Sequence, residues 1–403
     1  MHSPSSQNVP RDATILVTST LTVLAVTGIS AALPTLYHEF EEAPDAALLV
    51  RLVLTIPALF IMIGAPLAGT LIDRYGRIWL LTASIILFAI AGAAPMLARS
   101  LSEMLVARAV LGLAVAGLMT TLTTLIADFY DGPARSRLLG YQQAAMGLGG
   151  AIFVAAGGAL TAFGSRAPFL LHLIALAILP FVLRYVPEPP IASWTARTST
   201  GPDTGLDRAG VILVAGICAL GFLLQVSYNS LPIQLPFYLP EVTGATAAEA
   251  GLAISGLVLS YSAAALAAGS LGGRFRMASL LAGGYVLGGG AFLLVWRADG
   301  WSAFIPGLIL IGAGFGLVLP TLSAAVTTAA PPALRGRIVG AYSTSMFFGQ
   351  FVSPLLLQPV IDRVGTSAAF GLIGAILLLT GVTIWLGGRR ALRRSVATVL
   401  RPP

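Results

Sequence analysis

The sequence lacks most of the groups with which membrane enzymes do chemistry. It contains no lysine, one cysteine and three histidines in 403 residues. A single cysteine excludes a disulfide within the chain and a thiolate metal site. The histidines (His2, His38 and His172) are scattered, and there is no H-E-x-x-H pair, no phosphate-binding loop and no evident base for Cys218. We therefore expect that the chain is not an enzyme and binds no metal and no cofactor. A membrane-embedded enzyme is the weakest alternative.

Charge is scarce as well. Charged residues make up 10% of the chain and hydrophobic residues 57%, with a mean hydropathy of +0.89. Soluble domains carry about 25% charged residues. Apolar runs of membrane length recur throughout, which predicts an all-α integral membrane protein with the lipid bilayer as a partner. The net charge of +7 does not indicate nucleic acid, because the arginines gather in loops between the apolar runs.

Twelve transmembrane helices are expected. The first run has no convincing cleavage site, so it predicts a span rather than a signal peptide. The expected spans cover residues 14–37, 47–71, 78–98, 103–128, 137–162, 168–186, 209–238, 247–271, 278–297, 302–329, 334–361 and 367–387.

The arginines predict the orientation of these spans. With both termini on one side, 17 arginines fall on that side and five on the other (Arg51, Arg99, Arg166, Arg297 and Arg363), while Arg108 lies inside a span. The positive-inside rule then makes both termini cytoplasmic. Usage rich in alanine, glycine and arginine indicates a bacterial source, so we expect a multi-pass protein of the bacterial inner membrane.

An internal repeat with an offset of 200 residues supports the count of twelve. It places Gly69 on Gly269 and Arg74 on Arg274, and the same offset holds in later spans and loops. Two six-helix, pseudo-symmetric halves are therefore predicted. The expected divisions are an N-terminal half at 1–186, a cytoplasmic linker at 187–208, a C-terminal half at 209–388 and a basic tail at 389–403.

One loop carries a recognisable motif. The segment from Gly69 to Arg77 reads G-x-x-x-D-R-x-G-R between the second and third expected spans. It resembles the loop 2–3 signature of the major facilitator superfamily, the large family of twelve-helix solute carriers. The resemblance implies a conformational latch, in which the loop aspartate meets the positive end of the eleventh helix. The expected latch residues are Gly69, Asp73, Arg74, Gly76 and Arg77.

Two further motifs resemble the drug/proton antiporter branch of that family. Arg108, whose counterpart in the second half is Leu308, resembles the fourth-helix arginine that faces the central cavity and is implicated in proton coupling; the alternative is an arginine that snorkels to the interface. The fifth span is only partly similar to the antiporter signature, because Phe153-Val154 replaces its Gly-Pro. Close helix packing is expected at Gly112, Gly149, Gly157 and Gly158.

Polar side chains within the spans are candidates for a central pocket. No Asp or Glu lies near the middle of any span, which favours a neutral or anionic substrate over a permanent cation. The resemblance implies a monomeric secondary transporter that exports a small organic solute by alternating access, driven by a proton gradient; a proton-coupled uptake permease is the second possibility. Besides Arg108, the expected coupling or substrate residues are Gln142, Gln143, Met146, Gln225, Tyr228, Asn229, Tyr261, Met346 and Gln350.

Overall fold

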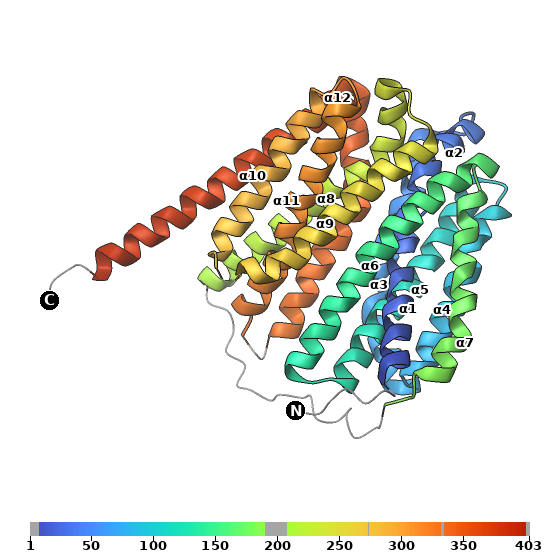
Figure 1. The fold of residues 1–403 in the computed structure, drawn as a ribbon, viewed down its shortest axis with the longest axis horizontal. Coiled ribbons are helices and arrows are strands. Elements are labelled where there is room, and N and C mark those ends of the chain that lie inside the picture. Colours follow the sequence, from blue (N-terminus) through green and yellow to red (C-terminus); the bar gives the residue numbers. More distant parts are fainter. Residues whose placement is uncertain (1–7, 190–207, 273, 332–333, 400–403) are drawn as a thin grey trace.

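A computed structural model describes residues 8–189, 208–272, 274–331 and 334–399. Over these residues the chain is a bundle of long helices (Figure 1). Eleven helical stretches are long and apolar enough to cross a membrane. The last of them, Arg335–Gly387, has 53 residues and contains a non-helical kink at Gly365, so it provides two crossings. The predicted all-α membrane fold is therefore confirmed.

The first half of the bundle runs from the N-terminus to Tyr185. Its opening span, expected as one helix over 14–37, is broken after Gly28, where a short 3₁₀ turn precedes a helix with Pro34 in its first turn. Proline fits the first turn because its missing N–H has no partner there. The helices of this half are α1 (Asn8–Thr27), α2 (Leu33–Glu39), α3 (Ala46–Tyr75), α4 (Arg77–Ala93), α5 (Leu101–Phe129), α6 (Gly132–Leu160), the 3₁₀ helix η4 (Ala167–Leu173) and α7 (Ile174–Tyr185).

The second half repeats this arrangement of helices. Gly365 has a positive φ of 82° and divides the last helix at the point where the chain must turn back. The helices are α8 (Arg208–Thr243), α9 (Ala247–Gly272), α10 (Met277–Trp296), α11 (Trp301–Ala329) and α12 (Arg335–Val399). Most of the expected linker, 190–207, lies outside the described residues, so the predicted domain boundaries stay a prediction.

The buried apolar residues form one large cluster in each half. A third cluster brings Ile233 of α8 among residues of the first half such as Leu33, Val50 and Phe169. This cluster joins the halves at one end of the bundle. We call it the far end, and the end that holds the 73–77 loop the signature end. In Figure 1 the far end is at the top, near α2, and the signature end is at the bottom.

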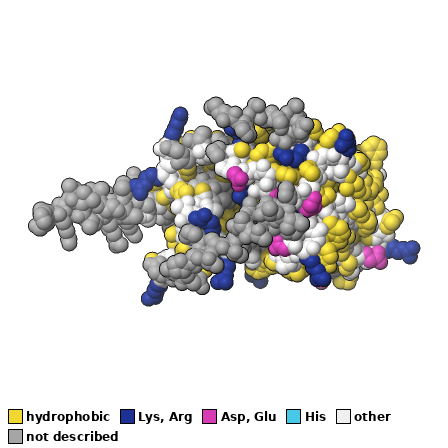
Figure 2. Space-filling view, turned by 90° about the horizontal axis from the view of Figure 1, so that it is seen from below, with side chains coloured by type: hydrophobic (Ala, Val, Ile, Leu, Met, Phe, Trp, Pro, Cys, Tyr) yellow, Lys and Arg dark blue, Asp and Glu magenta, His cyan; other side chains and the backbone are white. Residues whose placement is uncertain are grey.

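The signature end is a charged surface. Figure 2 shows it with arginine side chains spread over the face and several acidic side chains among them, while apolar side chains dominate the flank. This separation agrees with a bundle whose sides meet lipid and whose ends meet water.

Candidate functional site

The signature loop turns at Gly76. This residue has φ 91° and ψ 168°, and a Cβ there would lie 2.9 Å from Glu188 Oε1. Both facts favour glycine. The Glu188 carboxylate accepts hydrogen bonds from the backbone N–H groups of Arg77 at 2.6 Å and Ile78 at 2.7 Å. It therefore caps the positive end of α4, a contact that sequence reasoning missed because Glu188 was grouped with the polar linker.

Arg77 is the anchored member of the loop. Its Nε donates to Asp128 Oδ2 at 2.9 Å, and the two side chains are only 5% and 1% exposed. Asp128 lies in the last turn of α5. Removing one member of such a buried pair leaves an uncompensated charge in a medium of low polarity. The pair therefore fastens α4 to α5 inside the first half.

The other charged residues of the loop are free of the rest of the bundle in this conformation. Asp73 and Arg74 are exposed, and the Arg74 guanidinium stacks 5.3 Å from the ring of Tyr75. Within the described residues, no hydrogen bond or ion pair links Asp73 to α12, which begins at Arg335. The predicted latch is not closed here, and its role stays a prediction.

Arg108 is fully buried inside the first half. Its Nε donates to the carbonyl oxygen of Val53 at 2.9 Å, and its Nη2 donates to that of Ala25. Its Nη1 lies 3.4 Å from Nε2 of His172. The expectation that Arg108 faces the central cavity is wrong for this conformation, because α1, α3 and η4 surround the side chain. The snorkelling alternative is wrong for the same reason.

A cavity of about 680 Å³ lies between the two halves. Its wall includes Gly140 and Gly269, which lie toward the signature end. A Cβ at either glycine would meet no atom within 4 Å. The cavity therefore extends toward the signature end, whereas the third apolar cluster closes the far end.

The second half supplies the polar and aromatic part of the wall. The Tyr228 ring lies 5.4 Å from that of Tyr261 and 5.9 Å, edge-on, from that of Phe315. Gln225 and Asn229, one turn apart on α8, are joined by a bond from Asn229 Nδ2 to the Gln225 carbonyl oxygen at 2.9 Å. This wall offers ring faces for stacking and amides for hydrogen bonding.

The first half supplies a largely apolar wall. Ile61, Val115 and Met119 line it, together with the predicted residues Gln143 and Met146. Among the residues that the structure describes, the wall contains no charged side chain. The predicted residues that line the cavity are Gln143, Met146, Gln225, Tyr228, Asn229, Tyr261 and Gln350.

Besides Arg108, two predicted residues lie outside the cavity wall. Gln142 is buried, and its Nε2 donates to Ser19 Oγ of α1 at 2.9 Å. Met346 packs beside Gly221, where a Cβ would lie 3.3 Å from its Cγ. Both serve helix contacts in this conformation.

The glycines expected at helix contacts do lie where backbones approach closely. A Cβ at Gly112 would lie 2.5 Å from the Pro57 carbonyl oxygen, and one at Gly158 would lie 2.9 Å from that of Ala247. At Gly149 it would lie 2.6 Å from Thr20 Cβ, and at Gly157 it would collide with the Gly28 carbonyl. Small residues permit this approach between membrane helices.

The far end contains an arginine that sequence reasoning misplaced. Arg51, expected in an outer loop, lies within α3 and is 7% exposed. Its Nε donates to Gln234 Oε1 of α8 at 3.2 Å, so it bridges the halves. The expected span 47–71 already contained Arg51, and the loop assignment was wrong because α8 packs against the first turns of α3 and buries the side chain.

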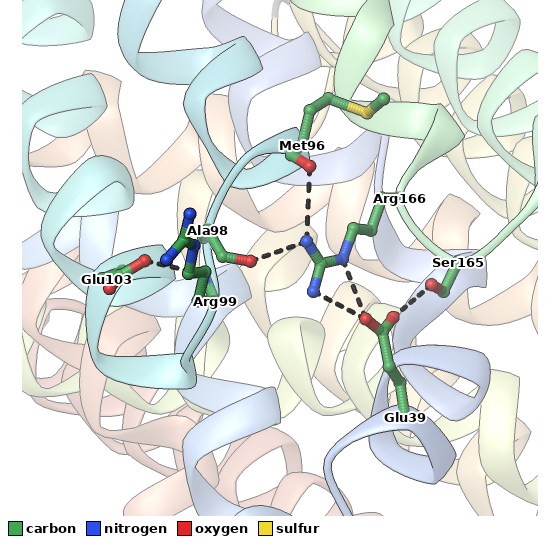
Figure 3. A network of polar contacts seen from close by, with 7 residues as sticks. All are labelled: Glu39, Met96, Ala98, Arg99, Glu103, Ser165 and Arg166. Atoms are coloured by element: carbon green, nitrogen blue, oxygen red, sulfur yellow. Dashed lines mark hydrogen bonds and ion pairs between the residues drawn. The ribbon is translucent and has the colours of Figure 1, made fainter.

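Arg166, by contrast, fastens the far end of the first half to itself. Its Nη2 lies 2.6 Å from Glu39 Oε1, and its Nη1 donates to the Met96 and Ala98 carbonyl oxygens at 3.3 and 2.6 Å. Ser165 donates to the same carboxylate. Figure 3 shows how this network gathers three loops of one half.

Comparisons with known proteins agree with this architecture. The family model described as the Major Facilitator Superfamily matches residues 15–242 and 217–399. The chain is 27% identical over 398 residues to the tetracycline resistance protein, class C, of Escherichia coli, covering 94% of this chain and 96% of that protein. It is 24% identical over 396 residues to the methylenomycin A resistance protein of Streptomyces coelicolor, covering 82% and 83%.

Solved structures share the fold at lower identity. The xylose transporter XylE from E. coli, in an inward open conformation, superposes with a TM-score of 0.75 at 17% identity, covering 94% of this chain and 95% of that one. The human organic anion transporter MFSD10 superposes with a TM-score of 0.70 at 19% identity, covering 95% and 100%.

Proposed function

Because the chain belongs to the Major Facilitator Superfamily, and is therefore a secondary transporter rather than an enzyme, we propose that it exports a small, uncharged organic solute by proton-coupled alternating access. The observation that carries this proposal is the cavity wall, which joins an aromatic and amide face to an apolar face without a charged side chain. Burying an unpaired charge against such a wall costs far more than burying a neutral polar group.

An anionic solute is the second candidate. It was expected together with a neutral one, because Arg108 was expected in the cavity. The side chain of Arg108 instead lies behind the wall and donates hydrogen bonds to backbone carbonyls. The cation that would have attracted an anion is therefore outside the cavity, which favours a neutral solute over an anionic one.

The export direction rests on sequence relatives. The names of two relatives, both bacterial, describe resistance to tetracycline and to methylenomycin A. Resistance proteins of this superfamily support export as the direction for this chain. A proton-coupled uptake permease is the alternative, because the fold shared with solved transporters does not determine the direction of transport.

Charge supports an orientation. The signature end carries arginine-rich loops such as those at 74–77 and 274–276, and cytoplasmic loops of membrane proteins are enriched in such residues. We therefore assign the signature end to the cytoplasm of a bacterial inner membrane. The cavity then opens inward, where an exporter collects its solute.

Proton coupling is proposed to act through the Arg108–His172 contact. Histidine can bind a proton when its surroundings are repacked or hydrated. A proton on His172 would place a second positive charge 3.4 Å from the Arg108 guanidinium, in a site enclosed by α1, α3 and η4. Repulsion at this distance would favour a different packing of those elements, which is the kind of change that coupling requires.

The test uses purified protein in proteoliposomes and three compounds that share one planar ring system. One carries a neutral amide, one a carboxylate and one a quaternary ammonium group. We expect the neutral compound to raise the melting temperature, to exchange in counterflow and to move in the direction opposite to protons. The acid should do so more weakly and the ammonium compound not at all. Equal counterflow of the ammonium compound would overturn the neutral substrate class, and chemical conversion without counterflow would overturn the transporter.

A further inference from the structure

Arg51 occupies an unusual position for a cation. It lies in the second turn of α3, nearly buried, and its guanidinium reaches from the first half to α8 of the second. Its Nη1 donates to the Ala47 carbonyl oxygen at 2.6 Å, and its Cζ lies 4.3 Å from the centre of the Phe237 ring. All of the near partners are neutral.

One acid interacts with this arginine beyond ion-pair distance. Asp362 of α12 acts on it electrostatically, but no ion pair within 4 Å joins Arg51 to a described acid. Asp362 is exposed and accepts instead from Gln358 Nε2 at 2.7 Å. The Gln234 amide that holds Arg51 has its own Nε2 buried without a partner. Arg51 is therefore held by one amide and one ring face, contacts that can separate without leaving an unpaired acid behind.

The internal repeat shows that this contact is one-sided. Tyr37 and Phe237 are counterparts at the 200-residue offset, and their rings meet edge to face at 6.2 Å. The two halves thus touch at the far end through equivalent aromatic residues. The counterpart of Arg51 is Gly251, so only the first half contributes a cation to this junction.

We propose that Arg51 is the positioning residue that holds the far end closed while the cavity is open toward the signature end. The inference rests on the proposed alternating-access function. When the guanidinium leaves Gln234 and Phe237, it regains water as the two helices part. The free energy that desolvation costs on closing is therefore recovered on opening. Such a contact suits a gate that must break in every transport cycle, in contrast to the buried Arg77–Asp128 pair.

Cysteine labelling in nanodiscs tests this proposal without a known substrate. The only cysteine is Cys218, so Cys218→Ser gives a thiol-free background. Ile233→Cys then places a reporter at a site that is 0% exposed at the far-end junction. We expect Arg51→Gln to raise the maleimide labelling rate of this reporter by about tenfold, the population shift that loss of a buried cation–π contact can produce. Arg51→Lys should restore part of the protection.

A second reporter separates gating from general loosening. Gly340→Cys faces open space near the signature end in this structure. A shift toward the alternative conformation should lower its labelling in Arg51→Gln, whereas a loosened fold would raise labelling at both sites. Arg166→Gln is the matched control, because that arginine at the same end bonds only within the first half, and it should change neither rate.

Phe237→Leu provides an independent variant in case Arg51→Gln folds poorly. It removes the ring face, keeps an apolar side chain and should increase labelling of the Ile233→Cys reporter in the same direction. Parent-like labelling in the folded variants, or a rise at both reporters, overturns the role of Arg51. Failure of every compound to move in counterflow would count against the transport proposal alone, because the labelling experiment needs no solute.

Discussion

At positions 200 residues apart, the first half of the chain buries charge where the second half does not. Arg77 corresponds to Met277, Asp128 to Thr328 and Arg108 to Leu308. Arg77 and Asp128 form a nearly dry ion pair, and Arg108 is fully enclosed. Met277 and Thr328 are exposed, while Leu308 packs in the apolar core.

The cavity shows the reverse division. Ile61 and Val115 of the first half and their counterparts Tyr261 and Phe315 of the second all line it. The same two positions of the repeat therefore hold aliphatic side chains on one wall and aromatic side chains on the other. The first half therefore holds the buried charges, including the proposed site of coupling, and the second half provides the aromatic and amide surface that is proposed to recognise a solute.

The largest expected effect comes from breaking the buried pair. Asp128→Ala would leave Arg77 without its carboxylate in a dry site, at a cost of about 3–5 kcal/mol. We expect thermal unfolding in detergent to show a large loss of stability. Thr328→Ala, at the equivalent and exposed position, should change stability by less than about 0.5 kcal/mol. Equal melting temperatures for the two variants would show that the halves do not differ in this way.

Arg108 should affect transport more than binding. Arg108→Leu copies the residue of the second half, and apolar replacement of a buried charge is often close to neutral for stability. Because the side chain lies behind the cavity wall, the dissociation constant of a transported compound should change by less than about threefold, under ~1 kcal/mol. Proton-driven transport should fall at least about tenfold, about 1.4 kcal/mol, because the repulsion between Arg108 and a protonated His172 that the proposed coupling uses is lost. Binding measured by calorimetry and uptake driven by a pH gradient provide the two readings.

A proportional loss of binding and transport would contradict the placement of Arg108. It would mean that the side chain reaches the solute in some conformation of the carrier. Gln142→Leu, another buried polar residue of the first half outside the cavity wall, serves as the control for changes in helix packing.

The fold could be read from the sequence because the length of apolar runs is set by the bilayer, and the 200-residue offset revealed the two halves. The rotation of each helix about its own axis could not be predicted from the sequence. Whether Arg108 points into the cavity or behind it depends on which neighbours surround α5, and the residue pattern of one helix does not contain that information. The amide and aromatic residues of α8 and α9 were easier to predict as cavity residues, since a polar group in a span must face protein or a cavity.

Arg51 and Glu188 were missed for a related reason. Arg51 follows the acidic stretch 39–45, so charge alone assigns it to a loop, and only the packing of α8 against α3 buries it. Glu188 caps α4 from 110 residues away along the chain. Contacts between distant segments of this kind leave no local periodic signal.

The aromatic wall should contribute moderately to affinity. Tyr261→Ile converts it to the residue of the first half and removes a ring that pairs with Tyr228. Aromatic pairs contribute about 0.5–1.5 kcal/mol beyond their buried area, so affinity for a planar solute should fall about 2- to 13-fold. Tyr285→Phe is the control, since Tyr285 lies outside the cavity wall and its hydroxyl donates to the Leu220 carbonyl oxygen. If both variants bind alike, the aromatic wall does not recognise the solute.

The smallest expected effect concerns Tyr130 at the signature end, whose counterpart is the buried Ala330. Tyr130 donates to Asp12 Oδ2 at 2.5 Å and accepts from Arg11 Nη2 at 2.8 Å. Burial, followed by the bond to Asp12, raises the pKa of its hydroxyl above the usual value. The folded state thus holds this proton more tightly than the unfolded chain, so the stabilisation is present below about pH 10 and is lost as pH rises through the folded-state pKa.

Tyr130→Phe should therefore cost about 0.5–1.5 kcal/mol at neutral pH, the usual contribution of one hydrogen bond. The difference in melting temperature from the parent should shrink at pH values above about 10, where the parent also loses the bond. Tyr75→Phe, at an exposed tyrosine of the same end, should show no difference at either pH. If the difference for Tyr130→Phe instead grows with pH, the pKa of the Tyr130 hydroxyl is lowered rather than raised. The bond from Arg11 would then affect that pKa more than the bond to Asp12.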